Sequence, residues 1–184
     1  FQKVRSYISG RYEKGLEVVP VSMNLSWMDF YDEALIDEIV DFLEHPEFPS
    51  ELIRFEITET SYAALEENVG KVLNKIKKKG AWILLDDFGS GYSSFNMLQR
   101  FSFDILKIDM SFTREIEMNS RTRRLIPLII ETAHALDAKT VAEGAETKEQ
   151  VEFLRNHGCD YIQGYYFYRP LKKDEFSEKL DQNS

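Results

Sequence analysis

Six segments of this 184-residue sequence end on polar residues whose side chains suit metal or phosphate chemistry. In chain order these residues are Asn24, Glu56, Asp86 with Asp87, Lys107 with Asp109, Glu143 with Glu146, and Gln163. Carboxylate and amide oxygens are hard ligands that suit Mg²⁺ or Mn²⁺. Two such metals about 3.5–4 Å apart can activate a water and stabilise the leaving oxygen of an in-line phosphoryl displacement. The series therefore predicts a divalent-metal site for phosphodiester chemistry.

The adjacent pair Asp86-Asp87 is the densest part of this series. Where a chain leaves the pleat at a strand terminus, two neighbouring carboxylates can bridge two metal ions. Lys107 would supply a cation for the attacking water or for a phosphate oxygen. Each residue alone has a simpler explanation, since an Asp pair is commonly a helix cap or turn and a lysine is commonly an exposed strand residue. The metal-site hypothesis rests on their occurring together and in order.

Other hydrolytic sites are disfavoured by what the sequence lacks. The histidines His45, His134 and His157 fall on predicted helices or turns, so a histidine-rich zinc hydrolase is not expected. The glycines near residues 89–91 lack the Gly-Lys-Ser/Thr of a P-loop, and Gly91-Tyr-Ser-Ser-Phe is not a serine nucleophile elbow. The net charge of −9 disfavours binding to bulk nucleic acid, but it allows a small anionic ligand held through metal ions.

Alternating strands and helices would position the polar residues. Apolar runs of strand length cover residues 16–24, 52–56, 82–86, 105–107, 139–143 and 161–163. Amphipathic stripes between them predict helices around residues 35–43, 65–76, 125–136 and 151–154. This alternation predicts an α/β fold with a parallel sheet, either doubly wound or a barrel. The active sites of parallel barrels lie at the C-terminal strand ends, where the polar residues would gather.

The number of units predicts an incomplete barrel. Six βα units are visible, whereas a TIM-like (β/α) barrel has eight strands and about 250 residues. The sequence begins at Phe1 rather than Met, and its first six residues are typical of the interior of a longer chain. We therefore expect residues 1–184 to be a single domain that lacks its two N-terminal units. No apolar run approaches the ~18 residues of a membrane span, and the single Cys159 fits a reducing compartment. We expect a cytoplasmic location.

The polar residues stand in segments that resemble the EAL family of cyclic di-GMP phosphodiesterases. The matching segments are Asn24-Leu-Ser26, Glu56-Ile-Thr-Glu59, Asp86-Asp-Phe-Gly-Ser-Gly-Tyr-Ser-Ser94, Lys107-Ile-Asp109, Ala142-Glu-Gly-Ala-Glu-Thr147, and Gln163-Gly-Tyr165 leading to Pro170. The resemblance runs from about Val19 to Leu171. It implies hydrolysis of cyclic di-GMP to linear pGpG by two Mg²⁺ or Mn²⁺ ions, in a domain that forms a homodimer.

The resemblance also implies a role for each residue of the metal site. Asn24, Glu56 and Asp86 match ligands of the first metal. Asp86 would bridge to a second metal, which Asp87 would serve. The residues that match those orienting or deprotonating the water are Glu143 and Lys107, and which of them is the base stays open at this point.

Outside the metal site, the resemblance implies supporting roles for six further residues. Gln163 matches a residue that supports the metal and its water. Glu59 would anchor the loop of residues 87–94, which includes Gly89 and Ser93 and in the family couples dimerisation to metal binding. Arg169 and Pro170 lie where the family closes over its ligand.

Two departures from the family pattern affect the expected function. Ala145 stands where Val is usual, which is a small change of packing. The Glu-Ala-Leu motif that names the family is absent, because it belongs on a strand before Phe1, and its Glu is a ligand of the first metal. We therefore expect the intact domain to be a phosphodiesterase and residues 1–184 alone to be inactive.

Two other functions compete with this expectation. The alternative is a non-catalytic cyclic di-GMP receptor, but degenerate family members of that kind usually lose acidic ligands, and none of the covered ones is lost here. A different metal-dependent barrel enzyme is disfavoured because the segment that starts at Asp86 is highly specific.

Overall fold

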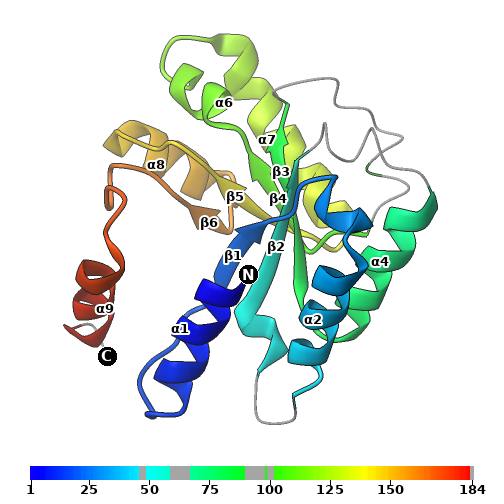
Figure 1. The fold of residues 1–184 in the computed structure, drawn as a ribbon. Coiled ribbons are helices and arrows are strands. Elements are labelled where there is room, and N and C mark those ends of the chain that lie inside the picture. Colours follow the sequence, from blue (N-terminus) through cyan, green and yellow to red (C-terminus); the bar gives the residue numbers. More distant parts are fainter. Residues whose placement is uncertain (46–48, 59–66, 90–97, 99–101, 183–184) are drawn as a thin grey trace.

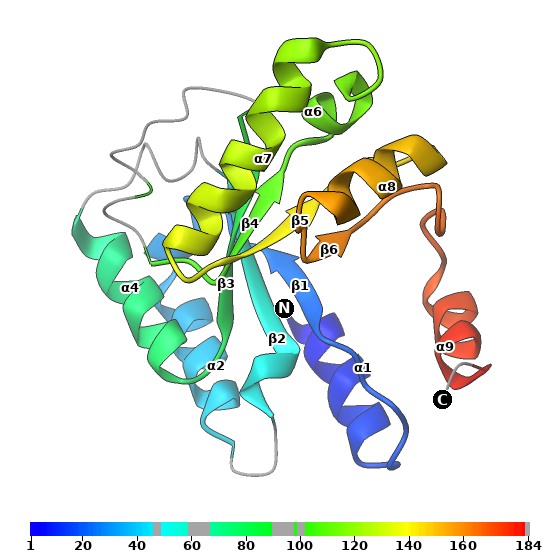
Figure 2. The ribbon, with the colours of Figure 1, turned by 180° about the vertical axis from the view of Figure 1, so that it is seen from behind.

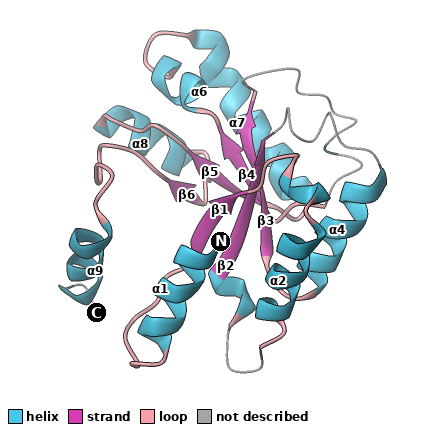
Figure 3. Cartoon of the chain, in the orientation of Figure 1, coloured by secondary structure: helices cyan, strands magenta, loops and turns pink. Residues whose placement is uncertain are grey.

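The computed structural model describes residues 1–45, 49–58, 67–89, 98 and 102–182. These residues form a curled sheet of six parallel strands with helices packed along its outer side (Figure 1 and Figure 3). The strands follow one another in the sheet in sequence order: β1 (Val21–Asn24), β2 (Ile53–Thr58), β3 (Trp82–Phe88), β4 (Ile105–Ile108), β5 (Lys139–Ala142) and β6 (Tyr161–Ile162). The predicted α/β fold, with six βα units of a TIM-like barrel, is confirmed.

The helices alternate with the strands, as Figure 2 shows from behind. They are α1 (Gln2–Tyr12), α2 (Glu33–Leu43), α4 (Glu67–Lys78), α6 (Met110–Glu115), α7 (Ser120–Ala135), α8 (Lys148–Asn156) and α9 (Lys173–Gln182), with short 3₁₀ turns η1 (Asp29–Tyr31) and η2 (Ser50–Leu52). The stripes predicted for α2, α4, α7 and α8 fall in helices, whereas α1, α6 and α9 were not predicted. In the described part of the chain, no helix combines the length and the apolar character that crossing a membrane would require.

The first strand is shorter than the sequence suggested, because β1 starts at Val21 and not at residue 16. Pro20 precedes it directly, and a proline has no N–H to donate to a sheet ladder. The ends of β4, β5 and β6 differ from the prediction by one residue each, and two others differ by two. β2 runs on to Thr58 and β3 to Phe88, because backbone pairing continues for two residues beyond Glu56 and Asp86.

The two faces of the sheet pack differently. Side chains on the outer face, such as Phe55 and Leu106, join the helices in the main hydrophobic core. On the inner face a second, smaller set is buried: Leu84, Ile105 and Val141, which we name the inner apolar cluster. Because residues two apart in a strand point to the same face, the inner face continues from this cluster toward the C-terminal strand ends.

The first and last helices are in contact although they lie far apart in the sequence. The Tyr7 Oη and Ser177 Oγ atoms are 3.0 Å apart, and Arg11 forms an ion pair with Asp181. The Lys173 ammonium lies 5.4 Å from the centroid of the Tyr7 ring. Helices α1 and α9 are therefore held together by polar contacts.

Candidate metal centre

Three site residues lie on the inner face directly beyond the inner apolar cluster. Asp86, Lys107 and Glu143 each stand two positions after a member of that cluster, on β3, on β4 and just past β5. The period of two in strands points all three side chains into the concave side of the sheet. Neighbouring parallel strands then bring them side by side, with Glu56 of β2 next to them.

The Lys107 ammonium lies at the centre of this group. Its Nζ atom is 2.8 Å from Glu56 Oε2, 2.7 Å from Asp86 Oδ1 and 2.8 Å from Glu143 Oε1. Only 7% of the lysine side chain is exposed. Burial by itself lowers the pKa of Lys107, but its hydrogen bonds to the three carboxylates outweigh burial and raise the pKa above its ordinary value. Lys107 is therefore a fixed cation among carboxylates from three strands.

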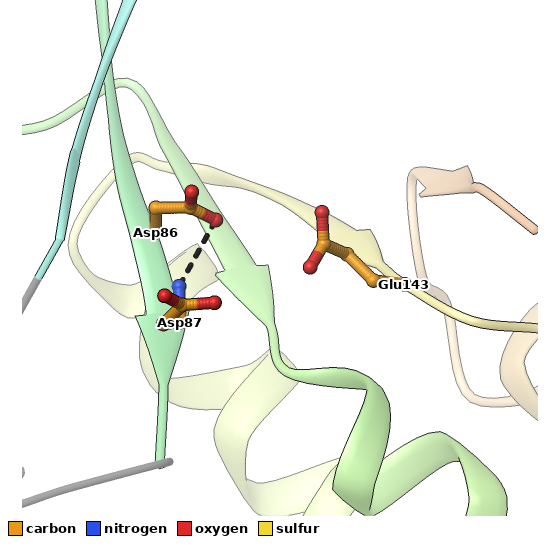
Figure 4. Close-up of side chains that lie close together, drawn as sticks. All are labelled: Asp86, Asp87 and Glu143. Carbon is orange, nitrogen blue, oxygen red and sulfur yellow. Dashed lines mark hydrogen bonds between the residues drawn. The ribbon is translucent and has the colours of Figure 1, made fainter. Parts of the chain in front are cut away.

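A bulge in β3 turns Asp87 toward the same site. The pairing of β3 with β4 shifts register between Leu85 and Phe88, and Asp87 has a φ of 55°. Asp tolerates this left-handed region better than most residues. In a regular strand the side chains of Asp86 and Asp87 would point to opposite faces. Here carboxylate oxygens of both residues and of Glu143 lie within 4.8 Å of one another (Figure 4).

The electrostatics of this set favour a bound cation. Burial raises the pKa of Asp87, and the nearby charge of Asp86 raises it further. Burial also raises the pKa of Glu143, and the pairing with Lys107 offsets this only in part. A divalent cation would favour the ionised form of each group. Because the donors are hard carboxylate oxygens gathered at one point, the residues fit Mg²⁺ or Mn²⁺.

Asn24 and Gln163 lie at the same edge of the sheet but outside this group. Asn24 is the last residue of β1, its Cα is paired in register with that of Glu56, and its side chain is exposed. Gln163 follows β6 and is also exposed, while its backbone N–H donates to the Ala142 carbonyl at 2.9 Å. Among the contacts of the described residues, none joins either side chain to Lys107.

Arg169 and Pro170 lie further away, on the segment that joins β6 to α9. The Arg169 guanidinium stacks 4.7 Å from the centroid of the Tyr165 ring. Both residues line a cavity of about 460 Å³ that also reaches Gln163 and Tyr165. The carboxylates do not line this cavity. A neighbouring cavity of about 280 Å³ connects Glu143 to Gln163 and Tyr165, so Gln163 lies between the two.

Comparison with known proteins identifies the family of this chain. The sequence profile of the EAL domain matches residues 3–170. This chain belongs to the EAL domain family. The cyclic di-GMP phosphodiesterase NbdA of Pseudomonas aeruginosa is 35% identical over 166 residues, which are 90% of this chain and 21% of NbdA. The chain thus spans about a fifth of the length of that relative.

Solved EAL structures share the fold. The EAL domain of Mycobacterium smegmatis DcpA matches with a TM-score of 0.88 at 25% identity, covering 98% of this chain and 81% of that one. Klebsiella pneumoniae BlrP1, in a complex with manganese and cyclic di-GMP, matches with a TM-score of 0.78 at 27% identity, covering 89% of this chain and 42% of that one. The family resemblance predicted from the ordered segments is therefore confirmed.

Two predicted site residues lie outside the described part of the chain, and two residues that line a cavity beside Glu143 were not predicted. Glu59 and Ser93 lie outside the described residues, whereas Gly89 directly follows β3. Sequence reasoning passed over Met110 and Arg114, which line the cavity beside Glu143. Their position in the sequence could have indicated them. They follow β4, and the C-terminal end of β4 carries Lys107.

Proposed function

We propose that this chain is the larger part of an EAL domain that hydrolyses one phosphodiester bond of cyclic di-GMP to give linear pGpG. The observation that carries the proposal is the close set of Asp86, Asp87 and Glu143 carboxylates beside the buried Lys107 ammonium. It is supported by the name of NbdA, a cyclic di-GMP phosphodiesterase, and by the manganese and cyclic di-GMP complex of BlrP1.

In this proposal the carboxylates hold two divalent ions, Mg²⁺ or Mn²⁺. Asn24, Glu56 and Asp86 would hold one ion, and Asp86 with Asp87 the other. When bound, the ions would polarise the attacking water and neutralise charge on the phosphate. The β3 bulge supports this arrangement, because it turns the Asp86 and Asp87 carboxylates toward the same side of the sheet.

Glu143 and Lys107 would divide the proton chemistry between them. Lys107 keeps its proton, because three carboxylates within 2.8 Å stabilise its charge. It would therefore act as a cation beside the water or the phosphate. Glu143, whose raised pKa makes it a better proton acceptor, would take the proton from the attacking water. In this proposal Glu143 is the base, a choice between two residues that the sequence motifs leave open.

Gln163, Arg169 and Pro170 would contact or support the ligand around this centre. Gln163 lines the cavity that contains Glu143, so its amide is suited to orient the water. Arg169 and Pro170 line the larger cavity next to it, where a guanidinium can pair with a phosphate. We further propose a homodimer and a cytoplasmic location for the intact protein.

The test is hydrolysis of cyclic di-GMP by the intact protein with saturating Mg²⁺ or Mn²⁺, followed by chromatography of the products. We expect pGpG as the product, and a Glu143→Gln variant should lose about 10²–10⁴-fold in kcat while still binding cyclic di-GMP. Tight binding without turnover by the unmodified protein would instead identify a cyclic di-GMP receptor. Residues 1–184 alone should show no turnover.

A further inference from the structure

The first turn of α6 approaches two turns that follow β3 and β5, the strands on either side of β4. At Gly89, after β3, an added Cβ would lie 2.2 Å from Cε2 of Phe112. At Gly144, after β5, an added Cβ would lie 2.5 Å from Cβ of Met110. Both distances are shorter than Cβ atoms tolerate, so α6 leaves no room for a side chain at either glycine.

These two glycines adjoin the carboxylates of the metal centre. Gly89 stands two residues after Asp87, and Gly144 directly follows Glu143. Both glycines have left-handed backbones, with φ of 95° and 72°. The path of each turn sets the direction of the acid next to it. A change in how α6 sits against these turns would therefore change the distance between the two carboxylates.

The start of α6 is itself held in place from several sides. Asp109 precedes the helix, and its Oδ1 accepts a hydrogen bond of 3.0 Å from the Ser111 N–H. The Asp109 N–H donates to the Phe88 carbonyl at 3.4 Å, and the Glu143 N–H donates to the Ile108 carbonyl at 3.1 Å. Backbone hydrogen bonds thus connect the segment that leads into α6 to the end of β3 and to Glu143, just past β5.

At the far end of α6, Glu115 accepts hydrogen bonds of 2.7 Å from Asn119 and from Thr122, which join the helix to the start of α7 and not to either turn. Arg114 and Glu146 approach to 3.9 Å, with 59% and 48% of their side chains exposed. An exposed pair of this kind contributes about 0–1 kcal/mol. Phe112, which is partly buried against the main core, and Met110, which is 44% exposed, are the α6 side chains that approach Gly89 and Gly144.

We propose that Phe112 and Met110 are positioning residues that set the spacing between the Asp87 and Glu143 carboxylates, and thereby the metal affinity. The inference rests on the proposed metal site and adds to it two apolar residues, whose side chains offer no hard oxygen donor to a metal. Oxygens that now lie within 4.8 Å of one another would lose this fixed spacing if the two side chains were removed. Changes to residues that orient metal ligands typically weaken metal binding about 10–100-fold.

The first test compares the effect of replacing Phe112 on Mn²⁺ binding with the effect of replacing a phenylalanine far from the metal centre. Phe42, buried near the end of α2, packs against Phe1 and serves as the control. In the intact protein we expect Phe112→Ala to weaken Mn²⁺ binding about 10–100-fold and to lower kcat more than it raises KM. Phe112→Leu should recover part of both, while Phe42→Ala should lower Tm without this loss. Free Mn²⁺ is measured by electron paramagnetic resonance.

A second test uses matched glycines and does not depend on the Phe112 variants folding. Gly144→Ala should weaken Mn²⁺ binding, because the new Cβ meets Met110. Gly158→Ala introduces a similar left-handed strain, at φ 81°, into open space and should leave Mn²⁺ binding unchanged. Equal Mn²⁺ affinities for Gly144→Ala and Gly158→Ala, or for Phe112→Ala and Phe42→Ala, would overturn the inference. Absence of Mn²⁺ binding by the unmodified protein would instead refute the proposed function.

Discussion

Replacing Lys107 by Met tests whether the lysine neutralises the carboxylates of the metal centre. In the metal-free protein its ammonium pairs with Glu56, Asp86 and Glu143, whose side chains are 14%, 11% and 19% exposed. Removing one partner of a buried ion pair typically costs about 3–5 kcal/mol, because the remaining charge stays buried without a counter-charge. We expect Lys107→Met to lower the free energy of unfolding by about this amount at pH 7 in the presence of a chelator.

Mn²⁺ should restore much of the stability lost in the Lys107→Met variant. A ligand at 100 times its Kd stabilises the folded state by about 2.7 kcal/mol. Because the ions would neutralise the same carboxylates as the lysine, Mn²⁺ should stabilise Lys107→Met more than the unmodified protein. The deficit should also shrink at acidic pH, since the unpaired carboxylates would then take up protons.

Urea unfolding with and without Mn²⁺ measures both effects. Lys79→Met is the control, because Lys79 forms a partly exposed ion pair with Glu44 and its loss should cost no more than about 1 kcal/mol. If Lys107→Met were as stable as the unmodified protein in the chelator, or if Mn²⁺ stabilised both equally, the idea that the lysine and the metals share these carboxylates would be wrong.

Two further predictions concern pH. Mn²⁺ affinity, measured by calorimetry, should keep rising with pH above the ordinary carboxylate range. The reason is that the raised pKa values of Asp87 and Glu143 make both acids ionise at a higher pH than usual. An affinity that does not change over this pH range would contradict the prediction. At the opposite end of the sheet, Asp160→Asn should lower the free energy of unfolding by about 1.5–3 kcal/mol in urea at pH 7. Burial raises the pKa of Asp160, but hydrogen bonds from His134 and Thr140 outweigh burial and lower it overall. The contribution of Asp160 should therefore be complete above its ordinary pKa and disappear as the pH falls through the lowered value, and an equal loss at pH 2 and pH 7 would refute it.

The helices that sequence reasoning missed show what the apolar pattern can and cannot reveal. α9 has no buried residue among those described, so no apolar stripe marks it. α1 buries only Ile8 and Arg11. Arg11 is not apolar, and its contact with Asp181 lies at the other end of the chain. Such helices are stabilised by contacts between distant segments, which a local pattern does not contain.

The sequence by itself determined the alternation of strands and helices, the polar residues beyond the inner apolar cluster and the EAL family. Buried parallel strands have a local signature, and the family segments occur in a specific order. The tertiary structure decided how those residues meet. Lys107 lies between Asp86 and Glu143 because β4 lies between β3 and β5 in the curled sheet. Asp87 joins Asp86 because the β3 pairing slips at that point. Both features depend on hydrogen bonds between segments that are distant in sequence, so a local sequence pattern cannot predict either of them.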